Sequence, residues 1–327
     1  MKTSLRLCTA ALCLSSLTAF GGTGGRSGPA VELNPPTPSV SFEFDVQESF
    51  VGSGDVERGG FNVRDFDEND FGARLIFTPR IKFGILRLGV AYERFDFGID
   101  ANDQERNGFL GGLSNGIVAI PLDAELPDKL QAANFVVGLD SEFSESLLFR
   151  IEAHPGWYGA GSDLFNSNNF RVPVIAGVTW IYSSTLQFTL GVGMDFEGKY
   201  PVLPGGGVRW QFAPQWTLNA VVPNPRLEYA VCKSFTVYGG ASIKADTYRV
   251  NDDFGVRAGD TRLNGAHLSY SEVRLGAGFD WKIIPGVTFS VEGGYLPYRS
   301  FDYARANVRY SQDGGAPYGG ISLKAAF

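Results

Sequence analysis

The sequence predicts an all-β chain that forms a transmembrane antiparallel up-and-down β-barrel of about 14 strands, with 12 strands as the alternative. Three observations predict it. Apolar and polar residues alternate over long segments, the connections between these segments are mostly long on one side and short on the other, and aromatic residues gather near the short connections. Successive side chains of a strand point to opposite faces, so each segment would carry one apolar and one polar face.

The composition excludes several other classes. Of 327 residues, 19% are charged and 13% are aromatic, and glycine occurs 42 times. Such low charge with many aromatic residues argues against disorder and against a coiled coil. The formal net charge of -7 provides no basic field for nucleic-acid phosphates, so we expect no nucleic-acid partner.

The first residues resemble an export signal. Lys2 and Arg6 precede an apolar stretch over 7–20, and small residues follow near Gly21. We therefore divide the chain into a signal peptide (1–21), a flexible leader rich in Gly and Pro (22–38) and one outer-membrane β-barrel domain (39–327). After cleavage, Cys232 would be the single cysteine, which excludes an internal disulfide framework.

The alternation is clearest between residues 186 and 197. Its apolar row is Leu186, Phe188, Leu190, Val192, Met194 and Phe196, and its polar or small row is Gln187, Thr189, Gly191, Gly193, Asp195 and Glu197. Similar segments run for about 9 to 15 residues, whereas strands of soluble proteins average about 5 or 6. A tilted strand needs about 9 to 11 residues to cross a membrane, so the length favours a membrane barrel.

The strand and turn positions follow from this pattern. We expect strands at 39–50, 70–79, 84–98, 134–143, 146–157, 170–182, 185–197, 205–213, 215–222, 226–231, 234–248, 267–282, 286–298 and 316–327. Short turns near 79–80, 144–145, 183–184, 214, 233 and 284–286 would face longer connections at 51–69, 99–133, 158–169, 198–204, 249–266 and 299–315. The segment Val222–Arg226 is either a very short outer turn or a break within one strand. This choice decides between a barrel of 14 strands and one of 12.

Aromatic residues near the short turns predict a girdle at the headgroup level, on the inner side of the membrane that the barrel would span. Its members would be Trp180, Trp210, Trp216, Trp281 and Phe327. The alternative is that they are scattered core aromatics of a soluble sandwich.

The last strand, Tyr318-Gly-Gly-Ile-Ser-Leu-Lys-Ala-Ala-Phe327, resembles the C-terminal assembly signal of bacterial outer-membrane barrels. The stretches 216–229 (WTLNAVVPNPRLEY), 235–241 (FTVYGGA) and 247–250 (TYRV) resemble a bacterial family of outer-membrane barrels of unknown function. This resemblance implies the barrel fold, a location in the bacterial outer membrane and recognition of the last strand by the barrel-assembly machinery. It implies no reaction.

Projecting the alternation inward gives a set of candidate lumen residues with nearly balanced charge. Lumen charges tune selectivity in such barrels, so this set predicts weak ion selectivity and cross-strand ion pairs. The candidates are Arg74, Arg87, Glu93, Arg150, Glu152, Asp195, Glu197, Arg209, Arg226, Glu228, Lys244, Asp246, Arg274, Asp280 and Glu292.

These features favour a porin-like channel for passive passage of small hydrophilic solutes, in contact with outer-membrane lipid and lipopolysaccharide. The alternative is a structural or surface-interaction barrel with a closed lumen. In the 99–133 connection, the apolar stretch Ile117–Ile120 would either fold inward and narrow the pore or form a hairpin above the membrane. The solute and the oligomeric state stay open.

We expect no enzymatic activity, cofactor or metal. A less favoured hypothesis, an outer-membrane lipid hydrolase, would pair His267 with Ser269, with Glu292 as the acid. The acidic segment 65–70 lacks the glycine and the distal glutamate of an EF-hand loop, so a solvated outer loop is favoured over a calcium site.

Overall fold

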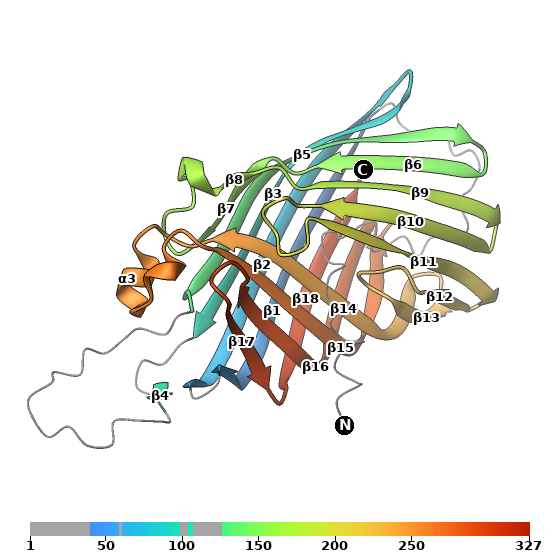
Figure 1. Ribbon diagram of the computed structural model, residues 1–327. Helices are drawn as coiled ribbons and strands as arrows, with labels where there is room; N and C mark the ends of the chain where they lie inside the picture. The colour runs from blue at the N-terminus through green and yellow to red at the C-terminus, as the bar shows by residue number, and fades with distance from the viewer. Residues whose placement is uncertain (1–39, 59–60, 99–103, 107–125) are drawn as a thin grey trace, which may run out of the picture.

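The computed structural model describes residues 40–58, 61–98, 104–106 and 126–327 (Figure 1). The proposed signal peptide and leader lie outside the described residues, as does Ile117–Ile120. The strands are β1 (Val40–Arg58), β2 (Phe61–Ile81), β3 (Gly84–Gly98), β4 (Gln104–Arg106), β5 (Lys129–Ser144), β6 (Leu147–Ala153), β7 (Gly156–Ala160), β8 (Phe170–Arg171), β9 (Val174–Ser183), β10 (Leu186–Met194), β11 (Val202–Ala213), β12 (Trp216–Asn219), β13 (Arg226–Cys232), β14 (Phe235–Arg249), β15 (His267–Ile284), β16 (Val287–Tyr303), β17 (Val308–Asp313) and β18 (Ala316–Ala326).

The strands close into one antiparallel barrel, because β1 pairs with β2 on one edge and with β18 on the other. Four short segments continue longer neighbours rather than adding to the wall. β4 pairs with β2 as β3 does, β7 pairs with β5 as β6 does, β8 pairs with β7, and β17 pairs with β1 and β16 as β18 does. The wall therefore has 14 strands, which confirms the predicted fold and strand number.

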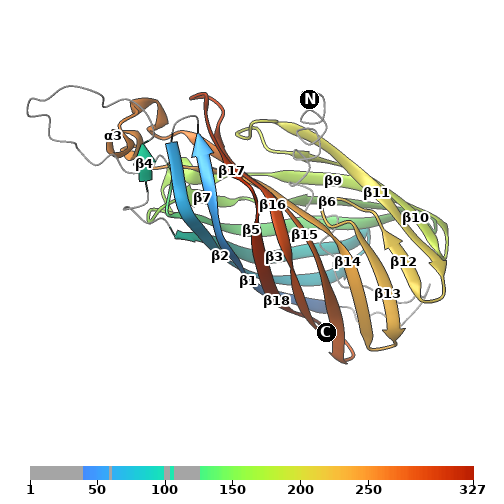
Figure 2. The same cartoon turned by 90° about the horizontal axis from the view of Figure 1, so that it is seen from below.

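The outer ends of several strands are longer than the sequence pattern indicated. The expected connection 51–69 is largely strand, because β1 continues to Arg58 and β2 starts at Phe61. β16 likewise runs to Tyr303, and β17 occupies much of the expected 299–315 connection. Figure 2 shows these long strands side by side at the end of the barrel that carries the longer connections.

The barrel wall is shortest along its strands at β12 and β13. Their connection contains a turn in which Val222 N–H donates to Gly206 O of β11, while Ile243 N–H of β14 donates to Pro223 O. The Val222–Arg226 segment is therefore a turn between two strands. Farther toward the outer end, β14 meets β7 in a single parallel bridge between Arg249 and Gly159.

Short helices lie at the outer end: η2 (Ser167–Asn169), α3 (Phe254–Ala258) and η3 (Thr261–Leu263). Gly259 ends α3 with a φ of 77°, a left-handed conformation that glycine adopts without a steric cost. Among the residues that the structure describes, no helix has the length and apolarity to cross a membrane.

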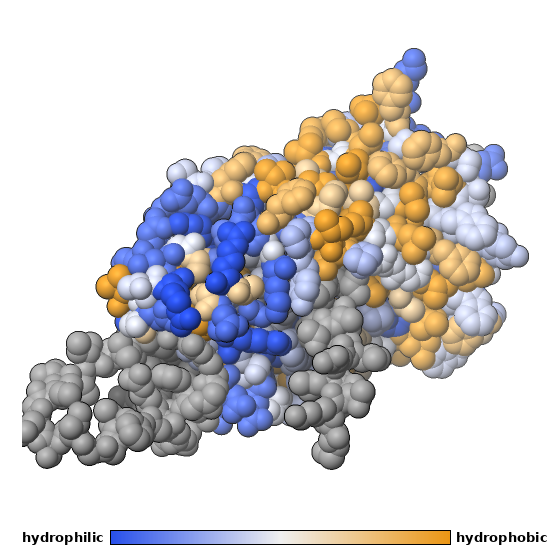
Figure 3. Space-filling view, viewed as in Figure 1, coloured by the Kyte–Doolittle hydropathy of each residue, from blue (hydrophilic) through white to orange (hydrophobic). Residues whose placement is uncertain are grey.

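The exterior of the barrel is apolar around much of its circumference. Large side chains such as Phe44, Leu75, Phe188, Leu190 and Leu275 are between 39% and 69% exposed. Figure 3 shows hydrophobic residues over the part of the wall that includes β9 and β10, and hydrophilic residues toward the outer end. Apolar surface of this extent would be unfavourable in water.

Candidate functional site

In several long strands, the alternation of apolar and polar residues reverses its phase toward the outer end. In the lower part of β3, Leu88 and Val90 are exposed and Arg87 is buried, whereas farther up Phe95 and Phe97 are buried. Before and between these phenylalanines, the outward positions carry Arg94 and Asp96. The lower part of the strand therefore has an apolar outside, and the upper part has an apolar inside.

The same reversal occurs in β15 and β16. Leu275 is 49% exposed, whereas Tyr270 is 1% exposed on the opposite face. Register pairs Tyr270 with Phe301 and Ser269 with Asp302, so the buried face is aromatic and the other face is polar. The reversal marks the level at which the outer face of the wall changes from apolar to polar.

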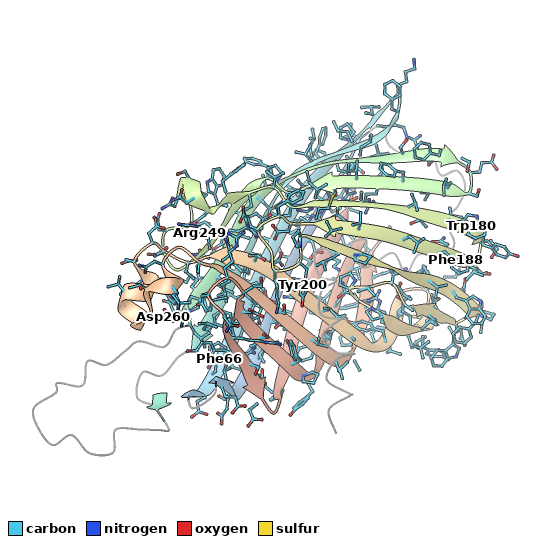
Figure 4. The ribbon with its side chains drawn as sticks, in the orientation of Figure 1. Phe66, Trp180, Phe188, Tyr200, Arg249 and Asp260 are labelled. Atoms are coloured by element: carbon cyan, nitrogen blue, oxygen red, sulfur yellow. The ribbon has the colours of Figure 1, made fainter. Side chains whose placement is uncertain are left out.

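Above this level the interior is filled by a hydrophobic cluster that we call the outer aromatic core. The ring centroids of Phe66 and Phe301 lie 5.5 Å apart, those of Phe97 and Phe301 5.2 Å apart, and those of Tyr270 and Phe301 5.0 Å apart. β2 and β3 thereby pack directly on β15 and β16, and side chains, among them Phe66 (Figure 4), fill the interior at this end. The core comprises Val56, Phe66, Phe95, Phe97, Leu126, Leu130, Ala132, Tyr158, Ala160, Tyr248, Val250, Ala258, Leu263, Leu268, Tyr270, Phe301, Tyr303, Ala306, Val308 and Tyr310.

Below the core lies a network of buried charges, the waist cluster, made of Glu68, Asp70, Lys244, Glu272, Arg274 and Arg299. Glu68 is fully buried and accepts from Arg274 at 2.8 Å and from the hydroxyl of Tyr270 at 2.6 Å. Lys244 donates to Asp70. These contacts join β2 to β14, β15 and β16 across the interior, so the lumen is also narrow at the waist.

A second network, the inner cluster, ties β1, β2, β3, β5 and β6 together. Glu152 is fully buried and contacts Arg74 at 2.7 Å, Arg87 at 2.8 Å and His154 at 2.9 Å. Arg87 also contacts Glu43 at 3.2 Å. On the neighbouring strands, Arg150 and Asp140 form an ion pair at 2.6 Å.

A cavity of about 200 Å³ lies in the remaining interior. Its charged lining includes Asp70, Lys244 and Arg274 from the waist cluster, together with Arg226, Asp280, Glu292 and Lys324. Arg226 contacts Glu228 at 2.7 Å and Asp280 at 3.4 Å. The hydroxyls of Tyr238 and Tyr318 donate to Glu292 at 3.1 and 2.7 Å.

Several sequence-derived candidates occupy other positions. Arg209 is 4.0 Å from Glu228, and Glu93 is 3.9 Å from Lys244. Asp195 forms an ion pair with Arg171 at 2.6 Å. Asp246 lies on the same face of β14 as Lys244 and was also a candidate lumen residue.

Glu197 lies beyond the end of β10, in the β10–β11 connection over 195–201. There it contacts Arg305 at 3.2 Å and His267 at 3.5 Å. In the same connection, Lys199 forms an ion pair with Asp302 at 2.6 Å. These contacts fasten the connection, which includes Tyr200, to the outer ends of β15 and β16 (Figure 4).

The candidate girdle residues are all substantially exposed. The exposed fraction is 49% for Trp180, 47% for Trp210, 39% for Trp216, 48% for Trp281 and 66% for Phe327. Trp180 stacks on Phe188 with a centroid distance of 5.7 Å (Figure 4). Each residue thus presents aromatic surface to the surroundings near a short turn.

The structure does not assemble a hydrolase triad from His267, Ser269 and Glu292. Glu292 accepts hydrogen bonds from two tyrosines inside the barrel, whereas His267 contacts Glu197 on the outside near the outer end. Burial lowers the pKa of His267 below its usual value, although Glu197 opposes this shift. No hydrogen bond joins His267 to Ser269 in the described part of the chain, where the Ser269 hydroxyl is 3.3 Å from that of Thr247.

The sequence analysis did not predict the outer aromatic core, because it assumed that the same face of each strand is apolar along its whole length. Phe66 fell in an expected loop, and Phe95 and Phe97 fell on the row assigned to a polar lumen. The sequence did contain a signal for this core. On one row of β3, the small or charged residues Arg87, Gly89, Ala91 and Glu93 are followed by Phe95 and Phe97. The buried partners Arg171 and Arg299 were also missed.

The geometry defines the class of protein: a closed antiparallel barrel with an apolar outside and a charged, partly filled inside. The chain belongs to the family described as Domain of unknown function (DUF6268), whose model matches residues 125–314. The predicted resemblance to a barrel family of unknown function is thereby confirmed. A search of the curated proteins found no match.

Several solved structures follow a similar course of the chain. An outer membrane channel from Pseudomonas putida F1 is 9% identical, with 90% of this chain and 100% of that chain covered and a TM-score of 0.46. The Ralstonia pickettii toluene transporter TbuX is 11% identical, with 92% and 94% covered and a TM-score of 0.43. A Pseudomonas aeruginosa FadL homologue is 12% identical, with 98% and 97% covered and a TM-score of 0.33. Likenesses of this size do not define a function.

Proposed function

We propose that the protein is exported, with removal of residues 1–21, and resides in the bacterial outer membrane as a single barrel domain. The exposed apolar belt supports this location, because lipid covers such a surface at no cost while water does not. Closure of the wall satisfies the backbone groups that hydrocarbon cannot. The exposed tryptophans near the short turns suit the headgroup level of the inner surface.

Within that membrane, we propose a channel for small hydrophilic solutes whose conductance is limited by the outer aromatic core. The cavity inside a charged barrel carries this proposal. A wall of 14 strands is wider than the side-chain-filled eight-strand size and narrower than open porins of 16 strands or more. Passage then requires displacement of the outer aromatic core, since this core closes the outer end.

Planar-bilayer recording tests the channel. We expect the wild-type protein to show small or brief current steps, and the double variant Phe66→Ala, Phe301→Ala to show larger and longer ones. Removing two interlocking rings loosens the core, because truncation of a buried Phe costs about 3 to 5 kcal/mol of packing. Phe165→Ala is the matched control, since Phe165 is 69% exposed and outside the core.

A structural or surface-interaction barrel with a closed lumen is the second candidate. The complete burial of Phe66, Tyr248 and Phe301 favours it, because a packed core closes the outer end in the described conformation. The same recordings separate the two candidates. If neither the wild type nor the double variant passed current at any voltage, the channel hypothesis would be excluded and the closed barrel would be favoured.

A further inference from the structure

One side of the barrel keeps an apolar exterior up to the outer end. In β8, Arg171 is buried, whereas Phe170 and the adjoining Val172 are 47% and 48% exposed. The upper part of β3 has the opposite arrangement, because Arg94 lies on the outer face and Phe95 is buried. The phase reversal of β3 and β15 therefore does not extend to β8.

The apolar row of β9 continues through Val172 into β8. Its members at every second position are Phe170, Val172, Val174, Ala176, Val178 and Trp180. The ten residue steps from Trp180 to Phe170 extend for about 33 Å, which at a tilt of about 45° corresponds to a height of about 23 Å. This height matches the apolar band of about 25 Å in membrane barrels. The corresponding row on β15 ends sooner, because Ser271 follows Val273.

Trp157 of β7 widens this surface. Register pairs Trp157 with Phe170 on one side and with Ala133 of β5 on the other. Ala133 shares a face of β5 with Phe135, which is 50% exposed in the apolar exterior of the barrel. Trp157, Phe170 and Val172, which we call the upper apolar patch, are therefore continuous with that exterior.

The patch is held in place by its surroundings. The rings of Trp157 and Phe170 make a T-shaped contact with a centroid distance of 5.5 Å, and Phe165 contacts Trp157 in the same way at 5.4 Å. In the β7–β8 connection, the buried side chain of Asn169 donates to the carbonyl oxygens of Asp163 and Leu164 at 2.8 and 3.0 Å. The aromatic surface is thus formed without a partner, so contact requires no ordering of the connection.

Lipid fits this patch better than a second copy of the chain does. Three half-exposed side chains of this kind offer roughly 300 Å², whereas a specific protein interface buries about 800 Å² on each partner. An indole ring combines an apolar body with a polar N–H group, so Trp157 suits the boundary between acyl chains and head groups. The patch also continues a surface that already matches hydrocarbon in height.

We propose that the upper apolar patch contacts the outer leaflet at the boundary between acyl chains and head groups. Lipid then reaches higher on the side of β7, β8 and β9 than at β3 and β15. The inference rests on the proposed location in the outer membrane and adds an interaction surface to it. Such a difference in apolar height around one barrel is accommodated by tilting or by a local change in bilayer thickness.

Tryptophan fluorescence of the full barrel in phosphatidylcholine vesicles tests the contact. Replacing Trp180, Trp210, Trp216 and Trp281 with Phe leaves Trp157 as the single tryptophan, and a second chain keeps Trp180 alone. Phosphatidylcholine brominated near the head-group end of its acyl chains is the lipid quencher, and iodide on both sides of the membrane is the aqueous quencher. We expect the brominated lipid to remove most of the fluorescence of Trp157 and of Trp180, and iodide to have little effect on Trp157.

Ser271→Trp in a chain without other tryptophans is the matched control, since Ser271 lies on the outward row of β15 beyond its apolar part. Its fluorescence should be lost to iodide and largely kept with brominated lipid. Gel migration before and after boiling shows that each chain is folded. If a multiple variant does not fold, the difference in quenching between the wild type and Trp157→Phe supplies the signal of Trp157.

The outcomes separate the patch from the membrane location. Quenching of Trp157 by iodide alone would overturn the patch, and so would protection from both quenchers, because protein would then cover it. In either case, quenching of Trp180 by brominated lipid would leave the membrane location standing. If brominated lipid quenched neither tryptophan, both proposals would fail. Equal lipid quenching of Trp157 and of the Ser271→Trp chain would overturn the one-sided contact.

Discussion

Glu152 shows how single residues hold the barrel wall in shape. Its carboxylate is fully buried and contacts Arg74 of β2, Arg87 of β3 and His154, which directly follows β6. Burying a charge is unfavourable unless partners and hydrogen bonds compensate. The network around Glu152 therefore depends on every member, and the loss of one leaves others uncompensated.

We expect Glu152→Gln to lower the free energy of unfolding by about 3 kcal/mol, because Arg87 would remain buried without its principal counter-charge. Urea unfolding of the protein in lipid vesicles measures the change. Glu142→Gln is the control, since Glu142 is exposed on β5 and should change stability by less than about 0.5 kcal/mol. Equal stability of the two variants would contradict the structural role of the inner cluster.

The residue scale also shows what the sequence could reveal about the site. Alternation places Arg74 and Glu152 on inward rows, because it depends on neighbours within one strand. It does not reveal that they meet, since they lie 78 positions apart and come together through the closure of the sheet. The same limit applies to Glu68 and Arg274, which are 206 positions apart.

At the scale of elements, strand number and most strand positions were predictable because apolar residues recur at every second position on the outer face. The positions of the strand ends were not predictable in this way. The outer parts of β1, β2 and β16 extend beyond the apolar belt, and their pattern changes to that of strands in a water-soluble protein. A single template for each strand assigns such segments to loops.

The phase reversal on β15 makes a direct prediction. Leu275→Arg should lower the free energy of unfolding by about 2 to 4 kcal/mol, because it places a charge against acyl chains. Ser271→Arg, four residues farther up the same outward row, should cost less than about 0.5 kcal/mol, because that position faces water. Unfolding in vesicles measures both, and equal costs would place the lipid boundary elsewhere.

At the scale of the whole molecule, Cys232 can report the orientation of the barrel in the proposed membrane. It is exposed at the end of β13, next to the β13–β14 turn, and is the free cysteine of the described residues. Its hydrogen bond with Ser234 lowers the pKa of the thiol, so a larger fraction is the reactive thiolate near neutral pH than for an ordinary cysteine.

In intact cells, a membrane-impermeant maleimide should leave Cys232 unmodified, because the proposed orientation places the short turns in the periplasm. Permeabilising the outer membrane should permit rapid modification, with a rate that rises with pH and levels off below the usual thiol pKa. A Cys232→Ser chain carrying Asp253→Cys at the outer end is the control and should react in intact cells. Modification of Cys232 without permeabilisation would reverse the orientation.

The length of β2 has a further consequence for what other molecules encounter. Its 21 residues extend for roughly 70 Å, which at a tilt of about 45° corresponds to a height of about 50 Å. The apolar band of such barrels is about 25 Å tall. In the outer membrane proposed for this protein, these paired strands would extend beyond the bilayer, and an antibody or phage approaching the cell would meet their hydrophilic flank before any lipid.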